Sequence, residues 1–347
     1  MCRLTDEDGN QGWGEAVTIA PEAARATTVM LKSWAEQLPG TEATPAAVGL
    51  FAERLGWWYG TQGGASGFAR AALDTASWDL LGKRLGGSVV DLLGGARHQT
   101  LPIITTGHAM RADLDEGADE FATWAGSVGA AGVKVGFGKA GEAHLGFDHD
   151  RDVAFMSRLR RALGDTAQIM IDISPRVQWS PAAAIRRVRA FEDHGLHWIE
   201  EPLGARNPEG YQRLRDATTT LLAYGEREWD VPGMAEILAT GTVDVLGIDP
   251  GRAGGISGFR DGATLAASHC RQVNAHAFAG PISYAAGLAV SLASTNCHQF
   301  EVAPLQNTLL TELTSGLKRP IDGTVSALQG PGLGVEVDVD RLEAIAE

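Results

Sequence analysis

Short apolar runs alternate with longer amphipathic runs from about residue 101 onward. Eight of the apolar runs have the length and composition of β-strands: LPIITT, GVKVGF, QIMIDI, HWIEE, LLAYGE, VDVLGID, CRQVNAH and CHQFEV. The segments between them are long enough for helices, and PAAAIRRVRAFEDHG has Ser180 and Pro181 at a typical helix start and Gly195 at a typical stop. Eight strands that alternate with helices predict an α/β protein with a parallel barrel.

The segment before the barrel has a different pattern. From Met1 to about Ala16, the turn residues EDGN separate two short β-compatible runs, which predicts a hairpin. Apolar residues at a spacing of about 3.6 then predict helices at Pro21–Leu38, Pro45–Leu55 and Ala69–Leu85. The Gly- and Trp-rich segment GWWYGTQGGASG interrupts this helical pattern. An additional layer of a hairpin and helices is therefore expected beside the barrel.

Composition narrows the class of protein. A chain of 347 residues suits a barrel of roughly 250 residues plus another layer. The 29 basic against 43 acidic residues give a net charge of −14, which opposes binding to nucleic acid. No apolar run of about 18 residues and no signal-peptide pattern are present, so we expect a cytoplasmic protein without a membrane partner. Cys2, Cys270 and Cys297 lack metal-ligand spacing and are expected to be ordinary thiols.

Five polar residues follow the pitch of the predicted barrel. They lie at or near the ends of successive strands, with gaps of 28, 26, 23 and 27 residues: Asp172, Glu200, Glu226, Asp249 and His276. Because the carboxyl ends of barrel strands face one mouth, these side chains are expected to converge there. The three acids that come first predict a metal site, and the Asp and His that follow predict a proton-transfer pair beside it.

A set of motifs, taken in order, resembles a known family. The motifs are GWGEA near the start, ALDTASWDLLGKRLGGSVVDLLGG before the barrel, and then WIEEP, AYGE and ID…GRAGGIS. Over nearly its whole length the chain resembles the enolase superfamily, in particular its mandelate racemase branch of acid-sugar dehydratases and racemases. The resemblance implies a modified barrel, (β/α)7β, with an α+β capping domain made from both termini. Capping loops in that family select the substrate, and the strand ends perform the chemistry.

This resemblance divides the chain into three expected parts. Residues 1–98 form the first part of the capping domain, 99–303 the barrel, and 304–347 a return to the capping domain. Relatives normally have a first strand and a substrate-covering loop before the segment corresponding to CRLTDEDGNQGWGE, whereas this chain begins inside that segment. Either the loop is absent or the start is short, and in both cases the region that best identifies the substrate is missing.

The resemblance also assigns the metal ligands. Asp172 of IMIDIS matches the first ligand, Glu200 of WIEEP the second, and Glu226 of AYGE the third. Three hard carboxylate ligands, with room for water and substrate oxygens, suit octahedral Mg²⁺ rather than zinc. Glu201 is then a neighbouring acid, and Ser174 occupies a place where relatives often carry a polar residue near the substrate.

The proton-transfer residues follow in the same way. His276 and Asp249 match the His/Asp dyad of the family, in which the Asp fixes the imidazole tautomer and raises its basicity. Glu301 on the last strand matches an acid that binds a substrate or enolate oxygen. His108, near the end of the first barrel strand, could point into the same mouth, but a structural role is the main expectation for it.

One departure from the family pattern concerns the second base. Racemases of this branch usually carry Lys-x-Lys on the second barrel strand, where the second Lys acts on the face opposite the His. Here Lys134 matches the first Lys, which can assist electrostatically, but Gly136 stands where the second is expected. Glycine cannot transfer a proton, whereas loss of water can use a single His as base and then as acid. The sequence therefore favours a dehydratase over a racemase.

The expected activity is removal of the proton α to the carboxylate of an acid sugar, followed by elimination of water. Two alternatives stay open. One is a racemase or epimerase with a rearranged second base, and the other is a barrel that binds metal and acids without efficient catalysis. The expected partner is a small carboxylate substrate, and the resemblance also implies a homo-oligomer.

Overall fold

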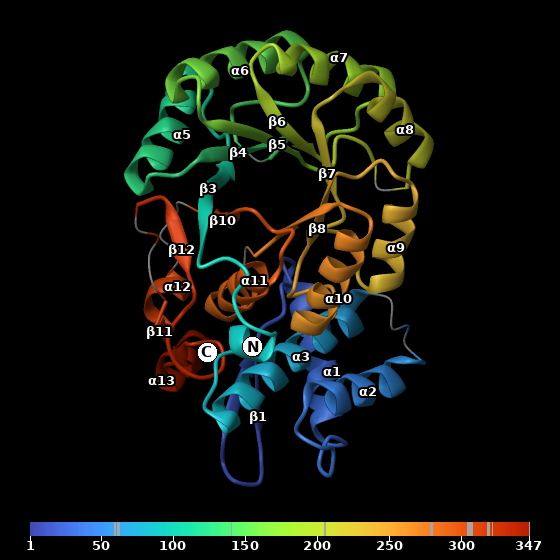
Figure 1. Cartoon of the computed structure of the whole chain (residues 1–347), viewed down its shortest axis with the longest axis vertical. Helices are drawn as coiled ribbons and strands as arrows, with labels where there is room; N and C mark the ends of the chain where they lie inside the picture. Colours follow the sequence, from blue (N-terminus) through green and yellow to red (C-terminus); the bar gives the residue numbers. More distant parts are fainter. Residues whose placement is uncertain are drawn as a thin grey trace.

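The computed structural model describes residues 1–346 except 59, 61, 62, 140, 205, 278, 279, 304–307, 318, 319 and 321. Within these residues, eight parallel strands follow one another around a nearly closed barrel (Figure 1). The strands are β3 (Thr100–His108), β4 (Gly132–Phe137), β5 (Gln168–Ile173), β6 (Leu196–Glu200), β7 (Leu221–Tyr224), β8 (Val245–Ile248), β9 (Gln272–Ala275) and β10 (Phe300–Val302). Because β10 pairs with β3, the last strand lies beside the first, and the predicted parallel barrel is confirmed.

Helices cover the outside of the barrel (Figure 1). In the described part of the chain, one helix follows each of the first seven barrel strands: α5 (Leu114–Val128), α6 (His149–Leu163), α7 (Pro181–Glu192), α8 (Pro208–Ala217), α9 (Val231–Ala239), α10 (Gly255–Ser268) and α11 (Pro281–Ala293). The start predicted for α7 is confirmed, since the Ser180 hydroxyl accepts the backbone N–H of Ala183. Seven β/α units and a final strand give the expected (β/α)7β arrangement. No helix among the described residues is both long and apolar enough to cross a lipid bilayer.

A second layer contains segments from both ends of the chain. Its N-terminal elements are β1 (Cys2–Thr5), β2 (Gln11–Gly14), α1 (Pro21–Ala35), α2 (Pro45–Gly56), α3 (Gly64–Leu85) and α4 (Val89–Leu92). The C-terminal elements are α12 (Thr308–Glu312), β11 (Thr314–Ser315), β13 (Glu336–Val337) and α13 (Val339–Ala346), whereas β12 (Thr324–Ser326) pairs antiparallel with β3 of the barrel. The backbone N–H of Leu333 donates to Asp79 of α3 (2.8 Å), so the C-terminal segment contacts the N-terminal helices. The domain boundaries near residues 98 and 303 stay a prediction.

Helix α3 is longer than its pattern predicts and connects this layer to the barrel. It begins at Gly64, earlier than the predicted start at Ala69, and Ser66 in its first turn is already buried. Asp74 of α3 accepts the backbone N–H of Ser257 (2.9 Å) in the first turn of α10, and the Trp78 indole donates to the Ser257 hydroxyl (2.9 Å). Burial raises the pKa of Asp74 from 3.8 to about 6 despite these hydrogen bonds.

We expect Asp74→Asn to change how stability depends on pH. Because the folded-state pKa is raised, the stabilising contribution of this group is fully present below about pH 4 and is lost as pH rises through about 6. Relative to wild type, the free energy of unfolding of the variant should therefore increase by ~3 kcal/mol between about pH 4 and about pH 7. Urea unfolding of both proteins across this range measures the difference. A difference that does not vary with pH would contradict the expected burial effect.

Candidate active site

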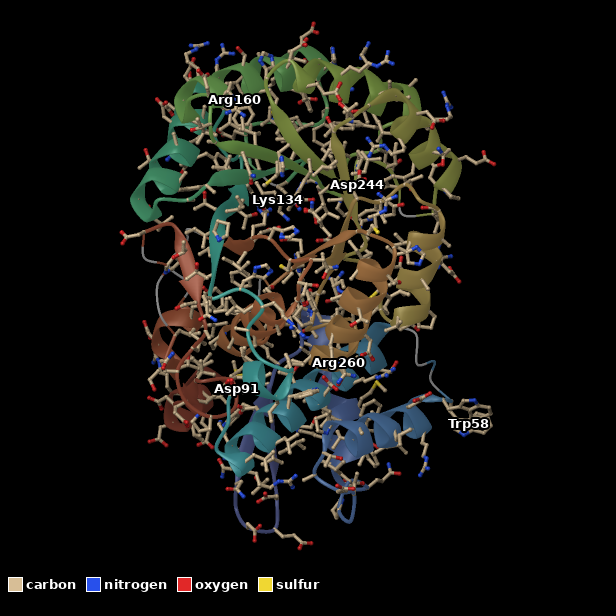
Figure 2. All side chains as sticks on the ribbon, viewed as in Figure 1. Trp58, Asp91, Lys134, Arg160, Asp244 and Arg260 are labelled. Atoms are coloured by element: carbon tan, nitrogen blue, oxygen red, sulfur yellow. The ribbon has the colours of Figure 1, made fainter. Side chains whose placement is uncertain are left out.

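The predicted site residues gather at the carboxyl ends of the barrel strands. In the strand register, Asp172 of β5 lies beside Glu200 of β6. Glu226 comes two residues after β7, whereas Asp249 and His276 directly follow β8 and β9. Lys134 and Glu301 lie within strands β4 and β10, and Figure 2 shows Lys134 among the barrel strands. Residues from seven strands therefore share one mouth.

Lys134 connects two acids across the interior of this mouth. Its Nζ lies 2.6 Å from Glu200 Oε2 and 2.8 Å from Glu301 Oε1, and all three side chains are buried. Burial alone would lower the pKa of Lys134, but the charges of Glu200 and Glu301 hold it well above its ordinary value. Lys134 thus remains protonated and suits an electrostatic role better than that of a base.

His276, which is partly buried, and Asp249, which is buried, form a hydrogen-bonded pair. The Nδ1 atom of His276 lies 2.9 Å from Asp249 Oδ2, and the other Asp249 oxygen accepts the backbone N–H of Gly251 (2.8 Å). A carboxylate at Nδ1 favours the tautomer with the proton on that nitrogen, so Nε2 can accept a proton. Burial lowers the pKa of His276, but the hydrogen bond and charge of Asp249 and the charge of Glu226 raise it to about 9. Near neutral pH the imidazole is therefore mostly protonated, and the pair has the geometry of an oriented acid–base group that acts as a base after it releases this proton.

Each of the three predicted metal ligands faces a basic side chain. Asp172 Oδ2 lies 3.1 Å from the Nζ of Lys139, Glu200 faces Lys134, and Glu226 Oε2 lies 3.4 Å from His276 Nε2. With these orientations, no group of three or more His, Cys, Asp or Glu side chains within the described residues is arranged to hold an ion.

The electrostatics of these acids nevertheless fit a hard cation. Burial first, and then the charges of Asp172, Glu226 and Glu301, raise the pKa of Glu200 to about 8, although Lys134 opposes this shift. The negative charge around Glu200 therefore exceeds what Lys134 alone offsets. Hard carboxylate oxygens are the ligands that Mg²⁺ prefers, so the donor set fits this ion even though its side chains face lysines and a histidine.

The structure shows a basic residue beside Asp172, Lys139, that the sequence analysis did not predict. Lys139 lies just beyond β4, and its side chain runs over Gly136 to reach Asp172. A Cβ atom on Gly136 would lie 2.9 Å from Lys139 Cε and 2.9 Å from His108 Cδ2, so the missing side chain leaves the space that these two residues occupy. The side chain of Lys139 therefore brings an amine close to the space left by Gly136. The sequence signal was the next Lys after the strand, in VKVGFGK.

The remaining predicted residues also lie around the mouth, in different roles. His108 is exposed beside Gly136, and partial desolvation and the charge of Lys139 lower its pKa. Ser174 is buried and accepts the backbone N–H of Arg176 (3.3 Å), as a turn residue does. Glu301 Oε1 accepts from Asn274 Nδ2 (2.5 Å), while its Oε2 has no hydrogen-bond partner among the described residues.

Glu201 has an unusual backbone conformation next to a predicted ligand. Its φ of 46° lies in the left-handed region, which non-glycine residues rarely adopt. Its carboxylate pairs with Arg227, and burial together with the charge of Glu226 raises its pKa to about 7. Because such strain persists only where the surroundings enforce it, Glu201 is held by the site rather than by local preference.

The fold is a parallel (β/α)7β barrel beside an α+β layer, and acids, lysines and a His/Asp pair gather at the mouth of the barrel. This combination defines a protein of the enolase superfamily. The chain belongs to the mandelate racemase/muconate lactonizing enzyme family: residues 1–94 match the family's N-terminal domain, and residues 116–341 match the enolase C-terminal domain-like family.

Several known proteins are similar to this chain. D-Galactarolactone cycloisomerase of Agrobacterium fabrum is 28% identical, over 99% of this chain and 89% of that protein. D-Galactonate dehydratase of Verminephrobacter eiseniae is 29% identical, over 97% of this chain and 88% of that protein. Among solved structures, an enolase from Bradyrhizobium, complexed with magnesium and mandelic acid, has a TM-score of 0.85 and 27% identity, over 99% of this chain and 88% of that one.

Proposed function

We propose that this protein is an acid-sugar dehydratase, a hydro-lyase that removes the proton α to a carboxylate and eliminates the β-hydroxyl as water. The observation that carries the proposal is the partly buried Asp249–His276 pair, in which His276 Nε2 faces Glu226 at the barrel mouth. The similarity to a galactonate dehydratase supports the substrate class. The similarity to a cycloisomerase supports the same first step, because both reaction types can begin by removing a proton next to a carboxylate.

The proposed cofactor is Mg²⁺, held by Asp172, Glu200 and Glu226. Their donor chemistry supports this assignment, and so does the similarity to a structure that contains magnesium. When bound, Mg²⁺ would draw electron density from the substrate carboxylate and make the α-proton more acidic. For Glu200 and Asp172 to serve as ligands, Lys134 and Lys139 would have to release or share the oxygens that they now face.

The protein's own groups account for the proton movements. His276 Nε2 takes the α-proton, while Asp249 holds Nδ1–H and stabilises the imidazolium. The same imidazolium then returns this proton to the departing β-hydroxyl, so that water leaves and the His is neutral again. Lys134 remains charged near the developing negative charge, and Glu301, which contacts Lys134, is the proposed acid for a substrate or enolate oxygen. The resulting enol tautomerises to a 2-keto-3-deoxy acid.

A screen of the purified protein with Mg²⁺ against a library of acid sugars tests this proposal. We expect one or a few members to yield a 2-keto acid, detected as its semicarbazone. Binding of Mg²⁺ and acid sugars without turnover would instead favour the metal-binding barrel that lacks efficient catalysis.

Lys139 favours a second candidate function, epimerisation by two bases. The Lys139 side chain reaches the end of β5, where it contacts Asp172, whereas His276 directly follows β9. In the order of the sheet these strands are four positions apart among eight, so the two basic groups approach the mouth from opposite sides. A substrate carbon between them could lose a proton to one group and gain a proton from the other.

We expect Lys139→Met to leave dehydration within about tenfold of wild type, because a single His can serve as base and then as acid. The measurement is 2-keto acid formation together with α-hydrogen exchange in deuterated water for both epimers of the substrate. The matched control is Lys139→Arg, which keeps the positive charge but cannot act as a base near neutral pH. A loss of 10²- to 10⁴-fold in exchange of one epimer, in both variants, would establish epimerisation with Lys139 as the second base.

A further inference from the structure

Glu15 of the GWGEA motif lies in the second layer but contacts a barrel helix. It directly follows β2, and its carboxylate is buried at the start of α11. Glu15 Oε1 accepts the backbone N–H of Gly280 (2.6 Å), and Oε2 accepts those of Ile282 (3.2 Å) and Ser283 (3.0 Å). A negative side chain thus satisfies three N–H groups that the helix itself leaves without partners.

The location of this contact matters because α11 is the helix that comes after β9 and His276. Gly280 comes four residues after His276. The fit is close, since a Cβ atom on Gly280 would lie 2.5 Å from Glu15 Oε1. The carboxylate therefore holds Gly280 firmly at the start of α11.

The same segment also touches the connection that carries the other member of the dyad. The backbone N–H of Val17 donates to the carbonyl of Gly251 (3.2 Å). Gly251 in turn donates its N–H to Asp249 Oδ1 (2.8 Å). A Cβ atom on Gly251 would lie 2.2 Å from Val17 Cγ2, so no side chain fits between these segments. Residues 15–17 thus contact the connections after both β8 and β9.

We propose that Glu15 is a positioning residue that, with Val17, holds the start of α11 and the connection after β8 so that His276 stays aligned with Asp249. The catalytic part of this inference rests on the proposed function, in which His276 is the base. The GWGEA motif then supports the active site indirectly, because Glu15 itself contacts neither the acids of the mouth nor the dyad side chains. Small shifts of an oriented base have large kinetic effects, because proton transfer depends on near-contact distances.

The substitution Glu15→Gln isolates this role. Gln has almost the same volume, but one of its two oxygen acceptors becomes an NH₂ donor, which must face backbone N–H groups. The start of α11 should therefore lose at least one hydrogen bond and shift. Asp79→Asn is the matched control, because Asp79 is also a buried acid of the same layer and accepts the backbone N–H groups of Trp13 and Leu333 (2.8 Å each), yet neither contact involves the β8 or β9 connections.

The first readout needs no substrate. In protein labelled with ¹⁵N-histidine, the Nδ1–H proton shared with Asp249 should give a downfield resonance, assigned by its loss in His276→Asn. We expect the resonance to be lost or broadened in Glu15→Gln and retained in Asp79→Asn. An unchanged resonance in Glu15→Gln, or an equal loss in both variants, would overturn the positioning role. If Glu15→Gln does not fold, Glu15→Asp keeps the charge but is shorter by one methylene, and an unchanged resonance there would overturn the role equally.

The second readout uses turnover. Glu15→Gln should lower kcat by on the order of 100-fold while KM changes by less than about threefold, because orientation rather than substrate binding is altered. A KM effect alone would contradict the inference. Absence of turnover in the wild-type protein would refute the proposed function but not the positioning role, because the resonance comparison does not depend on a substrate.

Discussion

Replacing His276 with Asn is expected to abolish both water elimination and exchange of the substrate α-hydrogen, with a loss in kcat of about 10³-fold or more. The reason is geometric as well as chemical. His276 Nε2 faces the acids of the mouth, whereas its Nδ1 is already engaged by Asp249. Asn can keep a hydrogen bond to Asp249 but has no group that accepts a proton near neutral pH.

Two further variants define what this loss means. Asp249→Asn should be severe but milder, because the imidazole remains while its tautomer and basicity are disturbed. His108→Asn is the matched control, since His108 is another His of the mouth and lies beside Lys139 rather than beside Asp249. Mass spectrometry of the substrate after incubation in deuterated water measures the exchange. Equal losses in the His276 and His108 variants would contradict the assignment of His276 as the base.

The sequence predicted the barrel well because each of its strands and helices leaves a local pattern in the sequence. Each strand is a short apolar run, and each connecting segment has helical periodicity, so the order of elements follows without knowledge of distant contacts. The convergence of Asp172, Glu200 and His276 was predictable for the same reason, since the carboxyl ends of parallel strands share one mouth. The structure places these residues around that mouth, although their roles stay predictions.

Lys139 shows where such reasoning fails. A motif is compared position by position, and Gly136 is simply a missing lysine in that comparison. Only the three-dimensional structure shows that the absent Cβ of Gly136 leaves room for the side chain of Lys139. This side chain reaches Asp172 from the loop after β4. Periodicity gives strand positions, but it carries no information about the path of a long flexible side chain beyond the strand.

Glu15 shows a second limit. Its partners Gly280 and Ser283 lie 265 and 268 positions away in the sequence, on a different layer. The GWGEA motif was recognisable as a motif, but nothing in its local pattern indicates that its acid satisfies the N–H groups at the start of α11. The left-handed backbone of Glu201 was equally invisible, because glutamate has no local preference for that conformation and surrounding contacts impose it.

Glu226→Gln is expected to weaken Mg²⁺ binding by about 100-fold or more and to abolish turnover while leaving the fold intact. The substitution removes one negative ligand but little volume, and a neutral amide oxygen is a weaker partner for a hard cation. It also removes one negative charge beside Glu200, so the total charge of the site attracts a divalent ion less strongly. Glu226 is only partly buried, at 19% side-chain exposure, so the loss of its charge should cost little folding stability.

Calorimetric titration of Mg²⁺ into wild type and variant measures the affinity without any need for turnover. The matched control is Glu201→Gln, because Glu201 is a buried acid next to a predicted ligand but its carboxylate is paired with Arg227. We expect the control to bind Mg²⁺ within about tenfold of wild type, the smaller effect typical of a residue that supports a ligand rather than acting as one. Unchanged affinity in Glu226→Gln would remove this residue from the metal site. An equal loss in Glu201→Gln would mean that total negative charge at the mouth, rather than a specific set of three ligands, attracts the ion.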